Sequence, residues 1–150
     1  MDNTALNKLR RYCAYQERCH EEVRSKLLEL KVYGDELEEI IATLVAEDFL
    51  NEERYAKAYA GGKFRMKQWG RVRIEKELRF RKVSAYCIRK AMEEIPEEVY
   101  LETLHKLFQK ARKQYAGGTP AQRHYKVRQF LLRKGYELDL VFSLLRSEGM

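Results

Sequence analysis

The sequence lacks several features that would assign it to a familiar class of protein. No apolar run approaches the roughly 18 residues needed to span a bilayer, so we expect no membrane insertion. The three cysteines are odd in number and form no CxxC pair, which favours reduced thiols in the cytoplasm over a disulfide framework. The first four residues, Met1-Asp2-Asn3-Thr4, lack the charged and then apolar pattern of a secretory leader. A hydrophobic content of 45% is too high for a disordered chain. We therefore expect a folded, cytoplasmic protein.

Catalytic signatures are also absent from the sequence. The stretch Gly61-Gly62-Lys63 is not a phosphate loop, because that motif needs GxxxxGK[ST] after a strand. Glu102 and His105 have the spacing used in di-iron bundles, but those sites need two such motifs and two further glutamates. No serine-nucleophile or zinc-ligand pattern occurs. We therefore expect no enzyme, no metal site and no cofactor, which leaves binding as the main class of function.

The sequence does contain a helical pattern of apolar residues that occurs three times. Corresponding positions are separated by 51 residues at the first step and by 53 at the second. A fixed period of this size indicates small supersecondary units that bury their apolar faces against one another. We predict an all-α fold, an elongated, curved array of three tandem three-helix repeats at residues 1–50, 51–96 and 97–150. The three sets are Val23, Leu27, Val32, Leu37, Ile40 and Ile41; Ile74, Leu78, Val83, Ile88, Ala91 and Met92; and Val127, Leu131, Tyr136, Val141, Leu144 and Leu145.

Local signals predict where the helices begin and end. Gly34 is predicted to end the second helix, and Asp35 to cap the third. Gly61-Gly62 is unfavourable inside a helix and is predicted to mark a bend or a close helix contact. Gly117-Gly118 is predicted to end a long helix, because glycine adopts the left-handed conformation without strain. The predicted N-caps of later helices are Asn51, Ser84 and Thr119.

The net charge of +7 is unevenly distributed along the chain. Residues 1–50 carry a net charge of −4, residues 51–96 carry +7, and residues 97–150 carry +4. A chain polarised in this way indicates a partner with an anionic component.

The basic residues are concentrated between positions 63 and 82, where nine of twenty are Lys or Arg. At about 100° per residue, Ile74 and Leu78 point into the repeat, whereas Arg73, Lys76 and Phe80 point broadly away from it. Guanidinium, ammonium and aromatic groups on one face suit phosphate contact with base stacking, or a groove on a protein. The third repeat carries a weaker version of this pattern. The predicted partner or nucleic-acid contacts are Lys63, Arg65, Lys67, Trp69, Arg71, Arg73, Lys76, Arg79, Phe80, Arg123, Lys126, Arg128, Arg133 and Lys134.

A structural explanation of the same residues remains open. Arg71, Glu75 and Arg79 are spaced to form ion pairs along one solvated helix. Phe80 would then pack on a neighbouring repeat, and the basic face would serve solubility.

Four segments resemble the RecX family of regulators of the RecA recombinase. The stretch Leu50-Asn51-Glu52-Glu53-Arg54-Tyr55-Ala56 resembles the family motif LnDeryA, and residues 63–74 resemble the block r..kG.rrI..eL that follows it. Residues 76–83 match eL..kgi, and residues 18–27 are similar to R.rS..eLr.KL. Departures are Glu52 in place of aspartate, Cys19 near the usual serine, and Lys31-Val32-Tyr33 in place of a common Lys-Gly-Phe. Lys134-Gly135-Tyr136 in the third repeat is close to that family form. The resemblance covers about Ala5 to Leu145.

The resemblance implies an elongated protein of three tandem three-helix repeats without catalytic activity. Family members bind in the helical groove of the RecA–DNA filament and restrain its ATP hydrolysis, strand exchange and co-protease activity. It implies that Tyr55 and Leu78 are structural, and that Arg71, Arg73 and Lys76 contact the partner. It also favours a monomer.

Three functional hypotheses follow from the sequence. The first is a modulator of the RecA filament, with direct contact to single- or double-stranded DNA left open. The second is a DNA-binding helical-repeat protein that acts alone. The third is a helical scaffold whose basic face only maintains solubility.

Overall fold

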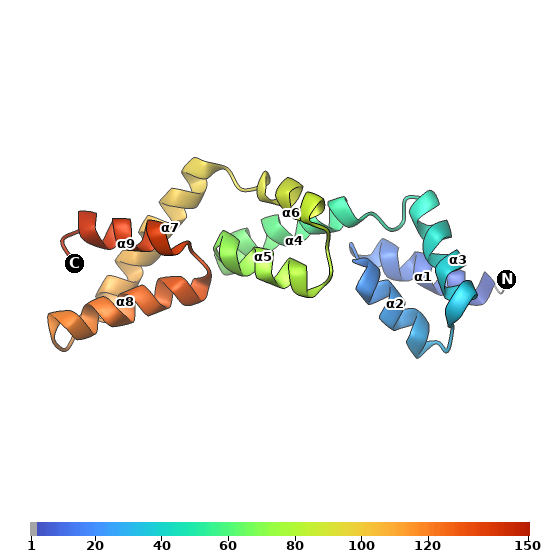
Figure 1. Ribbon diagram of the computed structural model, residues 1–150, viewed down its shortest axis with the longest axis horizontal. Coiled ribbons are helices and arrows are strands. Elements are labelled where there is room, and N and C mark those ends of the chain that lie inside the picture. The colour runs from blue at the N-terminus through green and yellow to red at the C-terminus, as the bar shows by residue number, and fades with distance from the viewer. Residues whose placement is uncertain (1–2) are drawn as a thin grey trace. The chain divides into compact units, whose positions relative to one another are not determined.

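The computed structural model describes residues 3–150, and in this part of the chain all regular secondary structure is α-helical (Figure 1). Met1 and Asp2 lie outside the described residues. They begin the stretch Met1-Asp2-Asn3-Thr4, in which the sequence predicts no secretory leader. Nine helices in sets of three confirm, for residues 3–150, the predicted all-α fold of three-helix repeats. No helix within these residues is long and apolar enough to cross a bilayer. The bounds are α1 Asn3–Tyr15, α2 His20–Glu29, α3 Gly34–Ala46, α4 Glu52–Lys67, α5 Arg71–Phe80, α6 Ala85–Met92, α7 Glu97–Gln114, α8 Pro120–Lys134 and α9 Leu138–Ser147.

Packing divides the chain into two compact units. Unit 1 contains the residues up to Tyr59 together with Leu78–Ala91, and unit 2 contains Ala60–Glu77 and Met92–Met150. Helices α4 and α5 contribute residues to both units. This division therefore does not test the predicted repeat bounds at residues 50/51 and 96/97, which stay a prediction.

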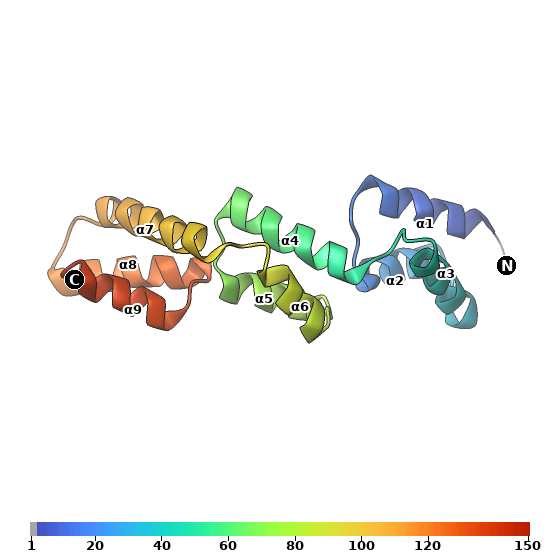
Figure 2. The ribbon, with the colours of Figure 1, turned by 90° about the horizontal axis from the view of Figure 1, so that it is seen from above.

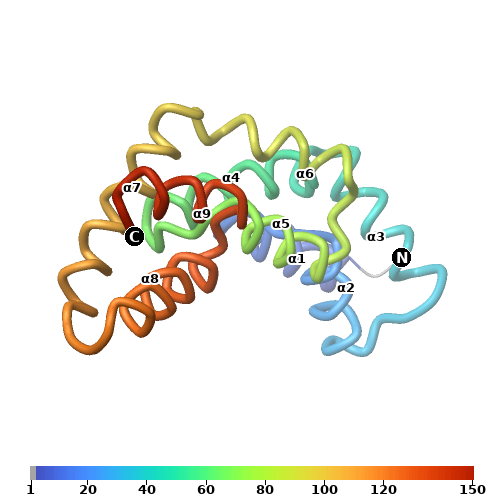
Figure 3. The backbone as a smooth tube through the Cα atoms, turned by 60° about the vertical axis from the view of Figure 1, so that its left-hand side comes forward, coloured from blue at the N-terminus to red at the C-terminus, as the bar shows by residue number. Residues whose placement is uncertain are grey.

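Each unit contains one complete three-helix set with its own core. In unit 1, α1 packs on α2 and α3, and α2 packs on α3 (Figure 2). Leu9, Val23 and Ile40 are fully buried in the core of this set. In unit 2, α8 packs on both α7 and α9, and the tube in Figure 3 follows the turn that joins α7 to α8. Tyr100 and Phe108 from α7 are fully buried in unit 2.

The threefold apolar pattern is buried as the sequence predicts. Each residue of the three sets is buried except Met92 and Leu144, which are partly exposed. Tyr55 and Leu78, assigned structural roles by the family resemblance, are also buried. The pattern therefore forms the packed faces of the helices.

The middle helix of each repeat ends in the same backbone turn. Lys31, Lys82 and Gly135 have φ angles of 63°, 60° and 103°, the left-handed conformation that closes a helix. The residue after each donates its amide to the carbonyl five positions earlier, as in the 2.9 Å bond from Val32 N to Leu27 O. These three residues are 51 and 53 positions apart. Lys31, and not Val32, therefore occupies the position that Gly135 holds in the third repeat.

Two predicted helix boundaries are wrong. Gly34 does not end α2, which stops at Glu29 because Lys31 supplies the left-handed turn. Gly34 is instead the first residue of α3, and Asp35 lies inside its first turn. Likewise α7 ends at Gln114, so Gly117-Gly118 lies in the turn beyond it.

The three predicted N-caps are confirmed. Asn51 Oδ1 accepts the amide of Arg54 at 2.9 Å, and Ser84 Oγ accepts that of Cys87 at 3.2 Å. Thr119 forms a capping box with Gln122 at the start of α8. The pair Gly61-Gly62 does not interrupt α4, which is helical on both sides of it.

Candidate anion-binding site

The candidate site forms where the start of α5 meets the end of α8, both within unit 2. The amide of Gly70 donates to Lys134 O at 2.8 Å, and that of Val72 donates to Gly135 O at 2.9 Å. The first amides of α5 thus satisfy the last carbonyls of α8. A Cβ at Gly70 would overlap the Gly135 carbonyl, and a Cβ at Gly135 would lie 2.8 Å from the Arg73 amide. Both glycines are needed for this close backbone approach, which we call the α5–α8 junction.

Arg71 lies at the junction, but its charge is already neutralised. Its Nη1 lies 2.7 Å from Glu97 Oε2, and its Nη2 lies 2.7 Å from Glu137 Oε2. Its Cζ is 3.9 Å from the centroid of the Tyr100 ring. The Tyr100 hydroxyl accepts the Arg71 amide at 2.9 Å and donates to Glu137. Arg71 therefore holds α5 to α7 and α9, and its partners are these distant residues, whereas the alternative explanation paired it with Glu75.

The pKa values in this network have physical causes that agree with this structural role. Burial alone lowers the pKa of Arg71, but the hydrogen bond to Glu97 and the charge of Glu137 outweigh it, so the pKa is raised. Burial, followed by the hydrogen bond to Glu137, raises the pKa of the Tyr100 phenol well above its ordinary value. The guanidinium therefore stays charged and the phenol stays neutral.

Arg73 points to the other side of the junction and covers the only tryptophan. Its Cζ is 4.0 Å from the centroid of the Trp69 ring, and Lys63 Nζ is 5.0 Å from the same centroid. Its Nη1 donates to Arg133 O at 3.3 Å. Trp69 therefore orients Arg73 by a cation–π contact and is not a bare stacking platform.

Two adjoining hollows open beside Arg73. One of about 300 Å³ is lined by Val72, Arg73, Lys76, Glu77, Leu132, Arg133 and Gly135. The other, of about 250 Å³, is lined by Arg73, Phe130, Arg133 and Lys134. Four basic residues surround the two hollows: Arg73, Lys76, Arg133 and Lys134. We call the two hollows together the cationic cleft. Among residues 3–150, none of these four side chains forms an ion pair with a carboxylate.

The charge of the cationic cleft is visible in the pKa of Lys134. Burial lowers this pKa, and the positive charges of Lys110, Arg73 and Lys67 lower it further. The Lys134 ammonium donates to the carbonyl of Lys67 at 3.1 Å. The cleft therefore has a positive potential that a bound anion would relieve.

The structure brings some of the predicted contacts together and separates others. Arg73, Lys76, Arg133 and Lys134 meet in the cleft, with Lys63, Lys67 and Trp69 beside it. Arg79 and Phe80 belong to unit 1, in which the Phe80 side chain is 82% exposed. The remaining predicted contacts, Arg65, Arg123, Lys126 and Arg128, lie on other parts of α4 and α8.

Arg123 and Arg128 make contacts within unit 2. Arg123 Nη1 donates to the carbonyl of Gly118 at 2.5 Å. Arg128 lies over the rings of Tyr125 and Phe142, with centroid distances of 5.3 and 5.6 Å. Lys126 and Arg65 are exposed.

Sequence reasoning missed three partners of these residues. Glu97 and Glu137 lie 26 and 66 positions from Arg71, and the charge of Lys110 on α7 lowers the pKa of Lys134. Helical spacing relates positions three or four apart, so no local signal could identify them.

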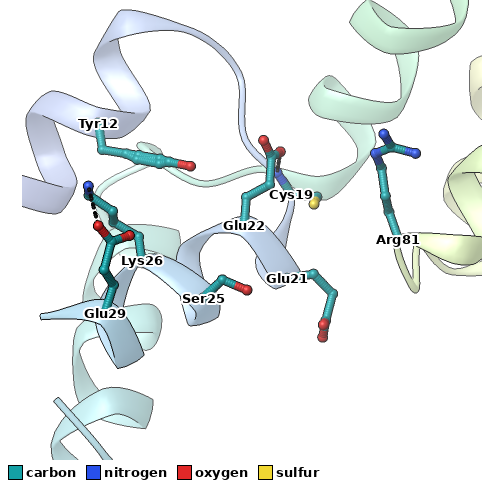
Figure 4. A pocket seen from close by; sticks show the side chains of 8 residues that line it. All are labelled: Tyr12, Cys19, Glu21, Glu22, Ser25, Lys26, Glu29 and Arg81. Carbon is teal, nitrogen blue, oxygen red and sulfur yellow. Dashed lines mark hydrogen bonds and ion pairs between the residues drawn. The ribbon is translucent and has the colours of Figure 1, made fainter. Parts of the chain in front are cut away.

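Unit 1 contains an equivalent hollow of different charge. It has a volume of about 260 Å³ and is lined by Tyr12, Cys19, Glu21, Glu22, Ser25, Lys26, Glu29 and Arg81 (Figure 4). The 51-residue period places Glu22 where Arg73 lies in unit 2, and Lys26 where Glu77 lies. We call it the acidic hollow, because three carboxylates line it. Internal pairs partly neutralise them, such as the 3.7 Å contact between Lys26 and Glu29 drawn in Figure 4.

The spacing of Glu102 and His105 on α7 does not assemble a metal site. His105 Nε2 lies 3.2 Å from Glu148, and Glu102 lies 3.7 Å from Lys106. Within residues 3–150, no group of three or more His, Cys, Asp or Glu side chains is arranged to hold a metal.

These features define a tandem three-helix repeat protein with a cationic cleft between successive repeats. The second three-helix domain of RecX matches residues 51–92, and the third matches residues 98–145. The chain belongs to the RecX family, as the sequence resemblance predicted.

Relatives and solved structures agree with this assignment. Regulatory protein RecX of Bacillus cytotoxicus is 28% identical over 87% of this chain and 48% of its own length. Regulatory protein RecX of Bacillus mycoides is 27% identical with the same coverage. The fold matches the crystal structure of RecX from Lactobacillus salivarius with a TM-score of 0.85 at 24% identity, covering 97% of this chain and 94% of that one. The chain spans about half the length of the curated relatives it matches.

Proposed function

We propose that this chain is a regulatory protein that binds the RecA–DNA filament and inhibits the ATPase, strand-exchange and co-protease activities of RecA. The observation that carries the proposal is the match of two consecutive RecX repeats, over residues 51–92 and 98–145. Because the relatives are about twice as long, their activity as whole proteins is part of the proposal. The proposed role is that of a cytoplasmic monomer that binds and performs no chemical step.

The cationic cleft is the proposed contact for the anionic component of the filament. Its four basic residues come from α5 and α8, and their side chains form no ion pair with a carboxylate within the described residues. Arg71 is left out of this contact set because Glu97 and Glu137 neutralise it. Arg73, Lys76 and Arg133 therefore carry the proposed contact.

The acidic first repeat is proposed to contact a basic patch on the RecA protein. Residues 1–50 have a net charge of −4, and the acidic hollow lies among them except for Arg81. Such a surface is repelled by DNA, whereas a cationic protein surface attracts it. The two repeats would then contact different components of one filament.

A RecA ATPase assay on single-stranded DNA tests the proposal. Increasing amounts of this protein should lower the ATPase rate to a plateau. The double variant Lys76→Glu with Arg133→Glu should raise the concentration needed for half inhibition by about tenfold or more, since it reverses two contact charges. Arg146→Glu, an exposed base at the end of α9, is the matched control. An ATPase rate that does not respond to the wild-type protein would refute the proposed function.

Charge reversal in the first repeat tests the division of roles. The variant Glu21→Lys with Glu29→Lys changes the acidic hollow, whereas Glu39→Lys changes an exposed acid on α3 outside it. The first variant should weaken binding to RecA-coated DNA, and the second should not. Unchanged filament affinity and inhibition in both would remove a role for the acidic hollow.

The cationic cleft also favours a second candidate, a helical-repeat protein that binds DNA by itself. Affinity for naked duplex DNA would then fall with salt, with a log–log slope of about −0.9 per phosphate neutralised. Binding to naked DNA and to RecA-coated DNA at physiological salt separates the two candidates. Preference for coated DNA supports the regulator, and equal affinity supports the second candidate.

A further inference from the structure

Two of the four basic residues of the cationic cleft, Arg73 and Lys134, are held in place before any ligand binds. Arg73 is fixed between the Trp69 ring at 4.0 Å and the Arg133 carbonyl at 3.3 Å. Lys134 is fixed by its bond to the Lys67 carbonyl. Preorganised donors lose less conformational entropy when a ligand binds than free side chains do. Arg73 and Lys134 are therefore preorganised, one from each helix, whereas Lys76 on α5 is exposed to solvent.

The donors of the cleft are side chains only. The first amides of α5 are already used, because Gly70, Arg71 and Val72 donate to Lys134 O, Tyr100 Oη and Gly135 O. A ligand in the cleft therefore meets guanidinium and ammonium groups, with Glu77 as the acid that lines one hollow. A multiply charged oxyanion satisfies such donors, and a guanidinium matches phosphoryl oxygens in a bidentate geometry.

The cleft offers little for recognition of a nucleobase. Trp69 lies against Arg73 and Lys63, and the apolar lining consists of Val72, Leu132 and Phe130. No asparagine or glutamine, the usual donors and acceptors for base edges, lines either hollow. The cleft would therefore recognise a phosphoryl group by its charge and shape, and it would not distinguish one nucleotide sequence from another.

The cleft also lies across two helices from different repeats. Arg73 and Lys76 come from α5, and Arg133 and Lys134 come from α8, about 60 residues later in the chain. Like charges on the two sides repel one another when the cleft is empty. An anion between them replaces this repulsion by attraction to both helices.

We propose that the cationic cleft is a phosphoryl-binding site and that its occupation tightens the α5–α8 junction. This inference rests on the proposed function, because it names the chemistry of the partner at the same surface. Phosphodiesters of nucleic acid and free polyphosphates share this chemistry. Binding at the cleft therefore stabilises unit 2 against unfolding.

Titration with pyrophosphate at constant ionic strength tests the site without RecA. Trp69 is the only tryptophan in the chain and lies against Arg73, so its fluorescence should change saturably. At ten times the dissociation constant, the equilibrium constant for unfolding should fall about 11-fold. Chloride at equal ionic strength is the solvent control. It should change neither the Trp69 fluorescence nor the equilibrium constant for unfolding.

Variants assign the binding to the cleft. Arg133→Gln and Lys76→Gln should each weaken pyrophosphate binding by about tenfold, since each removes one charge-assisted contact. Lys76 is exposed and unpaired within the described residues, so its variant should fold normally. Arg146→Gln, the control, should bind like the wild type. Equal affinity in the wild type and both cleft variants, or no binding of pyrophosphate, would overturn the inference.

A labelled oligothymidylate distinguishes the two phosphoryl sources. If pyrophosphate displaces it from the wild type and Lys76→Gln weakens both, the nucleic-acid backbone is the ligand. Binding of pyrophosphate alone assigns the site to free polyphosphate. RecA inhibition that persists without any phosphoryl binding would sink this inference while leaving the proposed function intact.

Discussion

Replacement of Arg71 by glutamine should destabilise unit 2 by about 3 kcal/mol, because the change leaves two carboxylates and an aromatic face without their cation. The side chains of Arg71 and Glu137 are 24% and 28% exposed, so the contact of Arg71 Nε and Nη2 with Glu137 Oε2 is partly screened. We assign it about 1.5 kcal/mol, the low end for a hydrogen bond to a charged group. Glu97 is 61% exposed, and its pair with Arg71 contributes about 0.5 kcal/mol or less. Stacking on Tyr100 contributes about 1 kcal/mol.

Denaturant unfolding followed by Trp69 fluorescence measures this loss within unit 2. Arg71→Lys should lose less stability than Arg71→Gln, since it keeps the charge but not the planar group that contacts both Glu97 and Glu137. Lys76→Gln on the same helix is the matched control and should change stability by about 0.5 kcal/mol or less, because exposed unpaired side chains contribute little. If the free energy of unfolding of Arg71→Gln lies within about 0.5 kcal/mol of the wild-type value, the reasoning is refuted. Lost filament binding with intact stability would return Arg71 to the contact set.

Three further predictions concern the turns and the buried tyrosines. Gly135→Ala should destabilise the protein by more than about 2 kcal/mol in thermal unfolding, because its φ of 103° and the nearby Arg73 amide exclude a Cβ; a smaller loss would mean that the junction adapts. Lys31→Gly should stabilise by about 0.5–1 kcal/mol in the same assay, because relief of a left-handed lysine outweighs the entropy of glycine; a loss would contradict the assigned turn. Burial raises the pKa of Tyr100, with added help from Glu137, and that of Tyr136 above the ordinary 10.0. The folded state holds these protons more tightly than the unfolded chain, so the stability they contribute is complete below about pH 10 and is lost as the pH rises above it. Unfolding midpoints across this range should therefore fall steeply, and less so in Tyr136→Phe; an unchanged midpoint would exclude the linkage.

The fold was predictable because its signals are local. The apolar period of 51 and 53 residues fixed the repeat and its buried faces, from Val23 to Leu145. The caps at Asn51, Ser84 and Thr119 followed from side chains that bond to amides three residues away. The end of α2 was mispredicted because Lys31 adopts a conformation that sequence preference assigns to glycine. The end of α7 was mispredicted because the helix already stops at Gln114, before the glycine pair.

The candidate site was predictable only in part. Arg73, Lys76, Arg133 and Lys134 were identified from charge density, which the sequence shows directly. Their meeting in one cleft was not, because it depends on the α5–α8 junction.

The sequence by itself determined the repeat, the helices and the excess of bases after residue 50, because each depends on neighbours within a few turns of chain. Only the tertiary structure decided which basic residues are available to bind an anionic partner. Arg71 and Arg73 are two positions apart, yet Glu97 and Glu137 neutralise one while the other lines the cleft. The reason is physical: successive helical positions point about 100° apart, and what each one meets is set by helices distant in sequence.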